Sequence, residues 1–160
     1  MSEQMERGQA WLTQLLEKMG YPSGVEPSQA PDGVYWLTID PHTLTAAQVE
    51  ALIGDRGHVI DAIQYLANTL LNIGLEREAQ HPYTVELAGY RVRRQGELEV
   101  LMADVSERVR ATGEAVELPD LSSAERRQVH HLFKDSEDLT TESRGFEPHR
   151  RLFVLRRTLD

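Results

Sequence analysis

The chain has 160 residues, no cysteine and a formal net charge of −9. The lack of cysteine excludes disulfide bonds and thiolate metal sites, and the length allows one ordinary domain or two small ones. No apolar run is long enough to cross a bilayer, and the polar, acidic first seven residues do not resemble a signal peptide, so the sequence predicts a soluble cytoplasmic protein.

The charge is distributed unevenly along the chain. Residues 1–90 carry 4 Lys and Arg against 12 Asp and Glu, whereas residues 91–160 carry 13 against 14. The acidic total argues against a generic nucleic-acid binder, but the asymmetry predicts two domains with different electrostatic roles. Alternatively, the arginines are solvated and paired with nearby glutamates. They cluster at Arg91, Arg93 and Arg94, at Arg126 and Arg127, at Arg150 and Arg151, and at Arg156 and Arg157.

The first half alternates helical and strand patterns. Glu6 to Met19 has an apolar helical face and stops at Gly20. Gly24 to Glu26 is a candidate short strand, and Val34 to Ile39 is a strand rich in β-branched and aromatic residues. Two helices follow, and Tyr83 to Leu87 alternates like a half-buried strand. The predicted order is α-β-β-α-α-β, with the helices on one side of a three-stranded sheet.

The turn Gly54-Asp55-Arg56-Gly57 separates the two central helices. Glycine suits a turn that needs positive φ or the close approach of another group. A helix N-terminus follows, and its N–H groups and dipole favour phosphate. A GxxG turn alone is more often a simple helix connector. The apolar residues after it recur at helical spacing and predict one apolar face of a longer helix: Val59, Ile60, Ile63, Leu66, Ala67, Leu70 and Leu71.

The second half begins with a long helical pattern from Arg91 to Thr112, stopped by Gly113. Its apolar seam consists of Leu98, Leu101, Val105 and Val109, so this helix either connects two domains or packs on both. The pair Ser122 and Glu125 has the spacing of a capping box and predicts a helix to about Lys134. The remaining strand candidates are Glu114 to Leu118, Leu139 to Ser143 and Leu152 to Arg157.

Arg126 and His130 stand four residues apart on the predicted helix, so they project from the same face. Arginine offers a planar fork suited to phosphate oxygens, and histidine can stack, donate a hydrogen bond or carry charge. Arg127 and His131 repeat the spacing on an adjoining face. On spacing alone, a helix whose basic residues pair with nearby carboxylates is favoured over a binding site.

These motifs carry a resemblance to a known family. The first half resembles a KH domain through Leu52-Ile53-Gly54-Asp55-Arg56-Gly57 and the helix after it, and the second half resembles the RxxxH (Arg-three-His) domain through Arg126 and His130. The combination is similar to bacterial single-stranded nucleic-acid-binding proteins of the Jag family, KhpB type. The additional N-terminal Jag domain of many members is not seen in this chain, so no membrane-linked role is expected.

The resemblance implies an α+β fold. It consists of a type II-like KH domain (α-β-β-α-α-β) at residues 1–90, a connecting helix at 91–113, and a small α/β RxxxH domain at 114–160. In KH domains the turn clamps the backbone of about four nucleotides, so Gly54 and Gly57 are expected to admit phosphates and Arg56 to supply charge. Asp55 departs from the family pattern, and its carboxylate would repel phosphate. We therefore expect this half to bind RNA weakly, or to serve as a dimerisation surface.

In the second half, the resemblance implies a basic surface of Arg126, Arg127 and His130, completed by Arg150 and Arg151. Phe133 and Phe153 are expected in the core. No histidine pair has metal-ligand spacing, and the sequence shows neither a Ser-His-Asp context nor a P-loop, so we expect no enzyme activity, no metal and no cofactor. The predicted function is binding of single-stranded RNA, or of single-stranded DNA, in post-transcriptional regulation. The alternative is an adaptor that self-associates or binds a small single-KH protein, with nucleic acid incidental.

Overall fold

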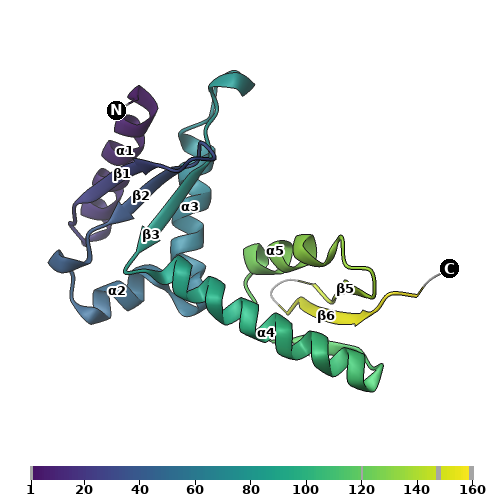
Figure 1. Cartoon of the computed structure of the whole chain (residues 1–160). Helices are drawn as coiled ribbons and strands as arrows, with labels where there is room; N and C mark the ends of the chain where they lie inside the picture. Colours follow the sequence, from purple (N-terminus) through teal and green to yellow (C-terminus); the bar gives the residue numbers. More distant parts are fainter. Residues whose placement is uncertain (1, 120, 147–148, 159–160) are drawn as a thin grey trace. The chain divides into compact units, whose positions relative to one another are not determined.

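The computed structural model describes residues 2–119, 121–146 and 149–158 (Figure 1). The chain forms two compact units, and the boundary between them falls between Arg91 and Val92. Each unit combines helices with its own three-stranded sheet. The mixed α+β class predicted from the sequence is therefore confirmed.

The first unit has the element order α-β-β-α-α-β. In its sheet, ordered β1-β2-β3, the first two strands are antiparallel and the last two are parallel. Short 3-10 turns lie at Pro41–Thr43, Asp55–Gly57 and Arg77–Ala79. The helices and strands are α1 (Glu3–Met19), β1 (Val25–Gln29), β2 (Tyr35–Ile39), α2 (Ala46–Ile53), α3 (His58–Leu70) and β3 (Tyr83–Leu87).

One apolar core joins the helices and the sheet of this unit. Alternate strand residues, such as Leu37 and Val85, share the core with Leu12 of α1, Leu52 of α2 and Ile60 of α3. Because successive side chains of a strand point to opposite faces, this pattern puts the three helices on one side of the sheet, as predicted. Helix α1 begins three residues earlier than expected, where the Ser2 side chain accepts a hydrogen bond from the Met5 amide.

The predicted apolar face of α3 is wider than the face that the structure buries. Ile60, Ile63 and Ala67 are buried, whereas Leu66 and Leu70 are exposed. Each residue turns the helix by about 100°, so Leu66 and Leu70 lie beyond the part of α3 that contacts the sheet.

The second unit is built from α4 (Tyr90–Thr112), β4 (Val116–Leu118), α5 (Ser123–Phe133), β5 (Leu139–Arg144) and β6 (Arg151–Arg156). Its strands are antiparallel in the order β4-β6-β5. The predicted seam of α4 packs into this unit's core through Leu98, Val105 and Val109, with Leu101 partly buried. The core also contains Val129 and Phe133 of α5 and residues from all three strands.

Phe153 corrects the sequence-based expectation. It faces Glu117 of β4 and Glu142 of β5 in the sheet register, and it is only partly buried. Its neighbours Leu152 and Val154 are core residues, so strand alternation directs Phe153 to the opposite face. Phe133, by contrast, is buried as expected.

None of the helices in the described ranges is both long enough and apolar enough to cross a membrane.

Candidate nucleic-acid interface

The turn between α2 and α3 has a left-handed backbone at three positions. The φ angles are 74° at Gly54, 53° at Arg56 and 78° at Gly57. Glycine adopts such angles at little cost, whereas a residue with a side chain is strained there. Arg56 is the position where this turn carries that strain.

Both glycines are also required by packing within the chain. A Cβ atom at Gly54 would lie 2.8 Å from the backbone nitrogen of Val59, and one at Gly57 would overlap the Tyr90 ring and hydroxyl. Backbone amides of the turn are used internally as well. Gly54 N–H donates to Glu50 O at 2.8 Å, and Gly57 N–H donates to Gly54 O at 3.2 Å. The glycines are thus explained by the fold before any phosphate is considered.

Asp55 and Arg56 form the exposed tip of this turn. Arg56 Nε donates to Asp55 Oδ2 at 3.3 Å. The carboxylate therefore offsets part of the positive charge that Arg56 presents at the turn.

The predicted capping box at the start of α5 is confirmed. Ser122 Oγ accepts a hydrogen bond from the Glu125 amide at 3.2 Å, and Glu125 Oε2 accepts one from the Ser122 amide at 2.9 Å. Glu125 also accepts from Arg94 Nε at 2.6 Å. The helix start is therefore fixed by its own cap and by α4 together.

Arg126 does not present the exposed fork that its spacing suggested. Its relative exposure is 9%. Nη1 donates to the Leu121 carbonyl and Nη2 to Ser123 Oγ, each at 2.9 Å. The physical reason is that position 126 lies on the helix face that carries the core residues Val129 and Phe133. The guanidinium therefore stabilises the first turn of α5.

His130 bridges α5 to the sheet and stays exposed. Its Nδ1 lies 2.5 Å from Thr141 Oγ1 on β5. Nε2 makes no hydrogen bond within the described ranges, so this nitrogen can meet a ligand. Arg127 and His131 are exposed too, and no carboxylate among the described residues pairs with either of them. On α5 the exposed cation is thus Arg127 rather than Arg126.

The predicted basic residues Arg150 and Arg151 lie at the β5–β6 hairpin. Arg150 is exposed and makes no ion pair with a described residue, whereas Arg151 lies 3.6 Å from Glu117 Oε1. Arg151 pairs with Arg144 in the strand register, three residues along β5 from Thr141. At about 3.4 Å per residue, the hairpin end is about 10 Å along the strand from the His130 contact.

Sequence reasoning missed one residue of this region and left another without a role. Arg144 Cζ lies 4.2 Å from the centre of the Phe153 ring, and Phe146, which the sequence did not place, is 89% exposed. Arg144 had been interpreted only as part of the turn-rich stretch between two expected strands.

Other arginines of the predicted clusters are used inside the fold. Arg91 donates to Asp61 Oδ1 at 2.5 Å and to the Val85 carbonyl at 3.1 Å. Arg94 pairs with Glu97 and Glu125. For these two residues the alternative interpretation, pairing with nearby carboxylates, is the one that the structure supports.

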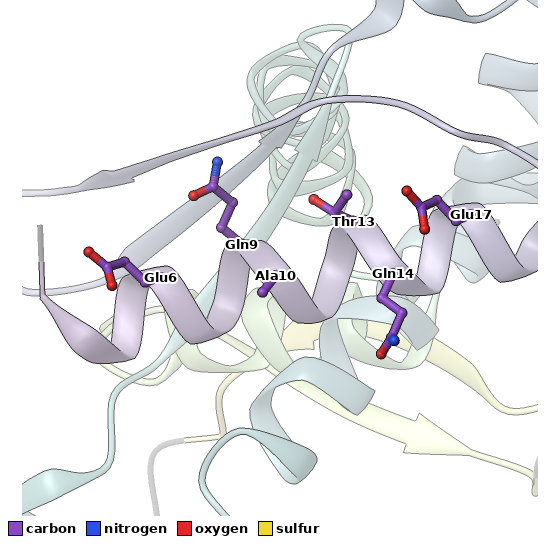
Figure 2. A pocket seen from close by; sticks show the side chains of 6 residues that line it. All are labelled: Glu6, Gln9, Ala10, Thr13, Gln14 and Glu17. Carbon is purple, nitrogen blue, oxygen red and sulfur yellow. The ribbon is translucent and has the colours of Figure 1, made fainter.

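Two hollows on the described surface contain none of the predicted site residues. Figure 2 shows one of about 390 Å³ along α1, lined by polar and acidic side chains that include Glu6 and Glu17. The other, of about 430 Å³, lies between α4 and α5 and is lined partly by Met102 and Leu132. The acidic hollow on α1 is unsuited to phosphate. Among the described residues, no group of three or more His, Cys, Asp or Glu side chains is arranged to hold a metal ion.

Comparison with known proteins finds a family match within the second unit. Residues 96–156 match the family of the RxxxH (Arg-three-His) domain, which is named for an arginine and a histidine with three residues between them. The chain is 31% identical over 103 residues to the RNA-binding protein KhpB of Clostridium symbiosum. It is 36% identical over 104 residues to the protein of that name from Lactiplantibacillus plantarum. Each alignment covers 64% of this chain, and 46% and 31% of the two relatives.

The chain spans less than half the length of these relatives. The domain match covers the exposed Arg127 and His130 on α5 and the β5–β6 hairpin. The match shows an RxxxH domain in the second half of the chain, and the two relatives show that the chain is similar to RNA-binding proteins of the KhpB type.

Proposed function

We propose that the chain binds single-stranded RNA through its RxxxH half, and single-stranded DNA by the same chemistry. The observation that carries the proposal is the set of exposed cations on α5 and the β5–β6 hairpin. Arg127 and Arg150 are exposed and have no carboxylate partner among the described residues. In a chain of net charge −9, these two guanidiniums provide a local site for phosphate. The two relatives are both named RNA-binding proteins.

The roles of the basic residues follow from their surroundings. Arg127, Arg150 and Arg151 contact phosphate oxygens, and His130 donates or accepts through Nε2, since its Nδ1 is engaged by Thr141. Arg126 acts indirectly, because its guanidinium holds the Leu121 carbonyl and Ser123 at the start of α5. This assignment keeps all five predicted basic residues in the site and changes the role of Arg126.

Residues 1–90 act as a type II-like KH domain on this proposal. The element order of the first unit and the turn from Gly54 to Gly57 support this assignment. Because the Asp55 carboxylate offsets the charge of Arg56, the turn contributes less to affinity than the RxxxH half. The proposed domain limits remain 1–90, 91–113 and 114–160, although the RxxxH match already begins within α4. The chain then acts in the cytoplasm as a binding protein in post-transcriptional regulation, and not as an enzyme.

A second candidate function is a protein-interaction adaptor. It is favoured by an apolar strip along α3 and just beyond it, where Tyr65 is 70% exposed and Ile73 is 68% exposed, with Leu66 and Leu70 exposed between them. Exposed apolar patches of this kind often mark protein contacts. The partner would be a second copy of the chain or a small single-KH protein.

Fluorescence anisotropy with a labelled single-stranded RNA tests the proposal. We expect Arg127→Ala and Arg150→Ala each to weaken binding several-fold at low salt, while Arg108→Ala has a smaller effect. Arg108 is a matched control because it is an exposed arginine of the same unit that lies 3.8 Å from Asp104. Arg126→Ala is expected to lower the free energy of unfolding by about 1–3 kcal/mol, because its hydrogen bonds are buried.

The proposal fails if Arg127→Ala and Arg150→Ala bind as Arg108→Ala does. If the wild-type chain binds no RNA at low salt while Tyr65→Ser abolishes association with a protein partner, the adaptor function is correct instead.

A further inference from the structure

The sheet of the second unit has two different faces. One face carries Leu118, Leu152 and Val154, which share a core with α4 and α5. On the other face, strand register brings Phe153 of β6 between Glu117 of β4 and Glu142 of β5. No side chain of this second face belongs to the core formed by the described residues of the unit. Within the second unit, the Phe153 face is therefore the one that its helices do not cover.

Phe153 and Arg144 are in contact on this face. The guanidinium carbon of Arg144 lies 4.2 Å from the ring centre of Phe153, which is within the range of a cation–π contact. Glu142 fixes the edge of the guanidinium with two hydrogen bonds, at 3.2 Å to Nε and 3.3 Å to Nη2. Because these bonds lie along the edge of the guanidinium, its flat side stays open to stacking. The Arg144 side chain remains 46% exposed.

Two further arginines and a second aromatic residue lie at the β5–β6 hairpin. Arg151 lies opposite Arg144 in the strand register, and Arg150 precedes it. Phe146, at the hairpin that joins the two strands, is the most exposed large apolar side chain among the described residues. An exposed ring gains free energy when an apolar or aromatic surface covers it. Phosphate alone would satisfy the arginines and leave the Phe146 ring in water and the Phe153 ring partly exposed.

We propose that the outer face of the β4-β6-β5 sheet, centred on Phe153 and Arg144, is a stacking platform for unpaired nucleobases. Unpaired bases stack on aromatic rings and on arginine planes. One base lies over the Arg144–Phe153 pair and a second over Phe146, while Arg150 and Arg151 contact the connecting phosphates. Bases in a duplex already stack on one another, so the platform selects single strands with little preference for sequence.

This inference rests on the proposed function and extends it. The cations of α5 supply attraction to the backbone, which a duplex also offers. The platform adds contacts to bases, which only an open strand offers. His130 contacts Thr141 on β5, and β5 is an edge strand of the sheet. One nucleic-acid strand that crosses this edge can reach both the α5 surface and the platform.

The test compares a short single-stranded DNA with an abasic strand of the same length, which keeps the phosphates and lacks the bases. We expect the wild-type chain to bind the base-containing strand roughly 10-fold more tightly, the effect of stacking about one base. Phe153→Leu keeps an apolar side chain, and Arg144→Lys keeps the charge. Both variants should lose most of this preference and keep only the part that Phe146 supplies, while their affinity for the abasic strand stays unchanged. Tyr65→Leu, which removes an exposed aromatic ring from α3, is the control and should keep the preference.

A Phe153→Trp variant provides a direct signal, since a base stacked on the indole quenches its fluorescence. The quenching should appear with the base-containing strand and be absent with the abasic strand. The platform is refuted if the wild-type chain binds both strands equally, or if Phe153→Leu and Arg144→Lys both keep the wild-type preference. Equal binding leaves the proposed function intact, whereas the absence of binding to either strand at low salt overturns both.

Discussion

Arg126 and Arg127 occupy adjacent positions of α5, about 100° apart around the helix axis. Arg126 is buried and donates to the Leu121 carbonyl and to Ser123, whereas Arg127 is exposed. The two residues have the same charge, and only their direction from the helix separates a structural role from a binding role. At the scale of single residues, function in this chain therefore depends on which face of an element a side chain occupies.

Gly57 is required both by its backbone conformation and by its contact with Tyr90. Replacing it with alanine should destabilise the chain by about 1–2 kcal/mol through the left-handed backbone, and further through the overlap with Tyr90. Gly74→Ala is the matched control, because Gly74 has a φ of 76° and nothing within 4 Å of the added atom. Urea denaturation should show a larger loss for Gly57→Ala. Equal losses would mean that Tyr90 moves aside freely.

Asp55 sets how much the KH-like turn contributes to binding. Asp55→Arg removes the carboxylate beside Arg56 and places a second cation at the exposed tip. We expect this variant to bind single-stranded RNA several-fold more tightly at low salt. Glu50→Arg, at an exposed position of α2 near the turn, makes the same change in net charge and serves as control. Unchanged affinity in Asp55→Arg would show that the turn does not meet a phosphate.

At the scale of elements, most of the chain could be predicted from sequence and some placements could not. The capping-box spacing of Ser122 and Glu125 correctly predicted the start of α5. The alternation of apolar and polar residues correctly predicted β3 at Tyr83–Leu87. The buried faces were harder to predict, because the apolar residues on α3 outnumber those that the sheet covers, and Leu66 and Leu70 stay exposed. Phe153 was assigned to the core, since a sequence does not show that one face of a sheet lacks a helix.

The candidate site shows the same limit. The helical spacing of Arg126 and His130 predicted a shared face, but Arg126 is buried, whereas His130 is exposed and contacts Thr141 of the edge strand β5. Spacing could not show that Arg126 lies beside the core residues of α5 and is therefore buried. The pairing of Arg144 with Phe153 depends on the register of β5 and β6, and no local pattern in the sequence specifies that register.

The contact between α4 and the start of β5 includes an ion pair. Arg110 Nε donates to Asp138 Oδ2 at 2.6 Å, and this hydrogen bond lowers the pKa of Asp138 to about 2. A carboxyl whose pKa is lower in the folded state contributes stability above its unfolded pKa of about 4, and loses it as the pH falls toward 2.

We therefore expect the difference in urea midpoint between the wild-type chain and Asp138→Asn to be largest at pH 6 and to shrink between pH 4 and pH 2. Both side chains are exposed, so the difference itself is small. Arg110→Gln should show the same pH dependence. A difference that stays constant from pH 6 to pH 3 would mean that the pair contributes nothing to stability.

At the scale of the whole molecule, the net negative charge opposes the binding of a negatively charged nucleic acid. The chain carries −9 overall, yet 13 of its 17 basic residues lie in residues 91–160. Long-range attraction to nucleic acid is therefore weak, and binding depends on short-range contacts at exposed guanidiniums. Residues 1–90, with 12 acidic side chains, repel a strand that approaches elsewhere.

The most direct measurement is the salt dependence of affinity for a single-stranded RNA. On this account, the logarithm of the association constant falls linearly with the logarithm of salt concentration, by roughly 0.7 for each phosphate neutralised. Arg127→Ala and Arg150→Ala should each make that slope shallower by about 0.7, and Arg108→Ala should leave it unchanged. A wild-type affinity that does not respond to salt, or slopes that are the same in all three variants, would contradict the assignment of phosphate binding to the RxxxH half.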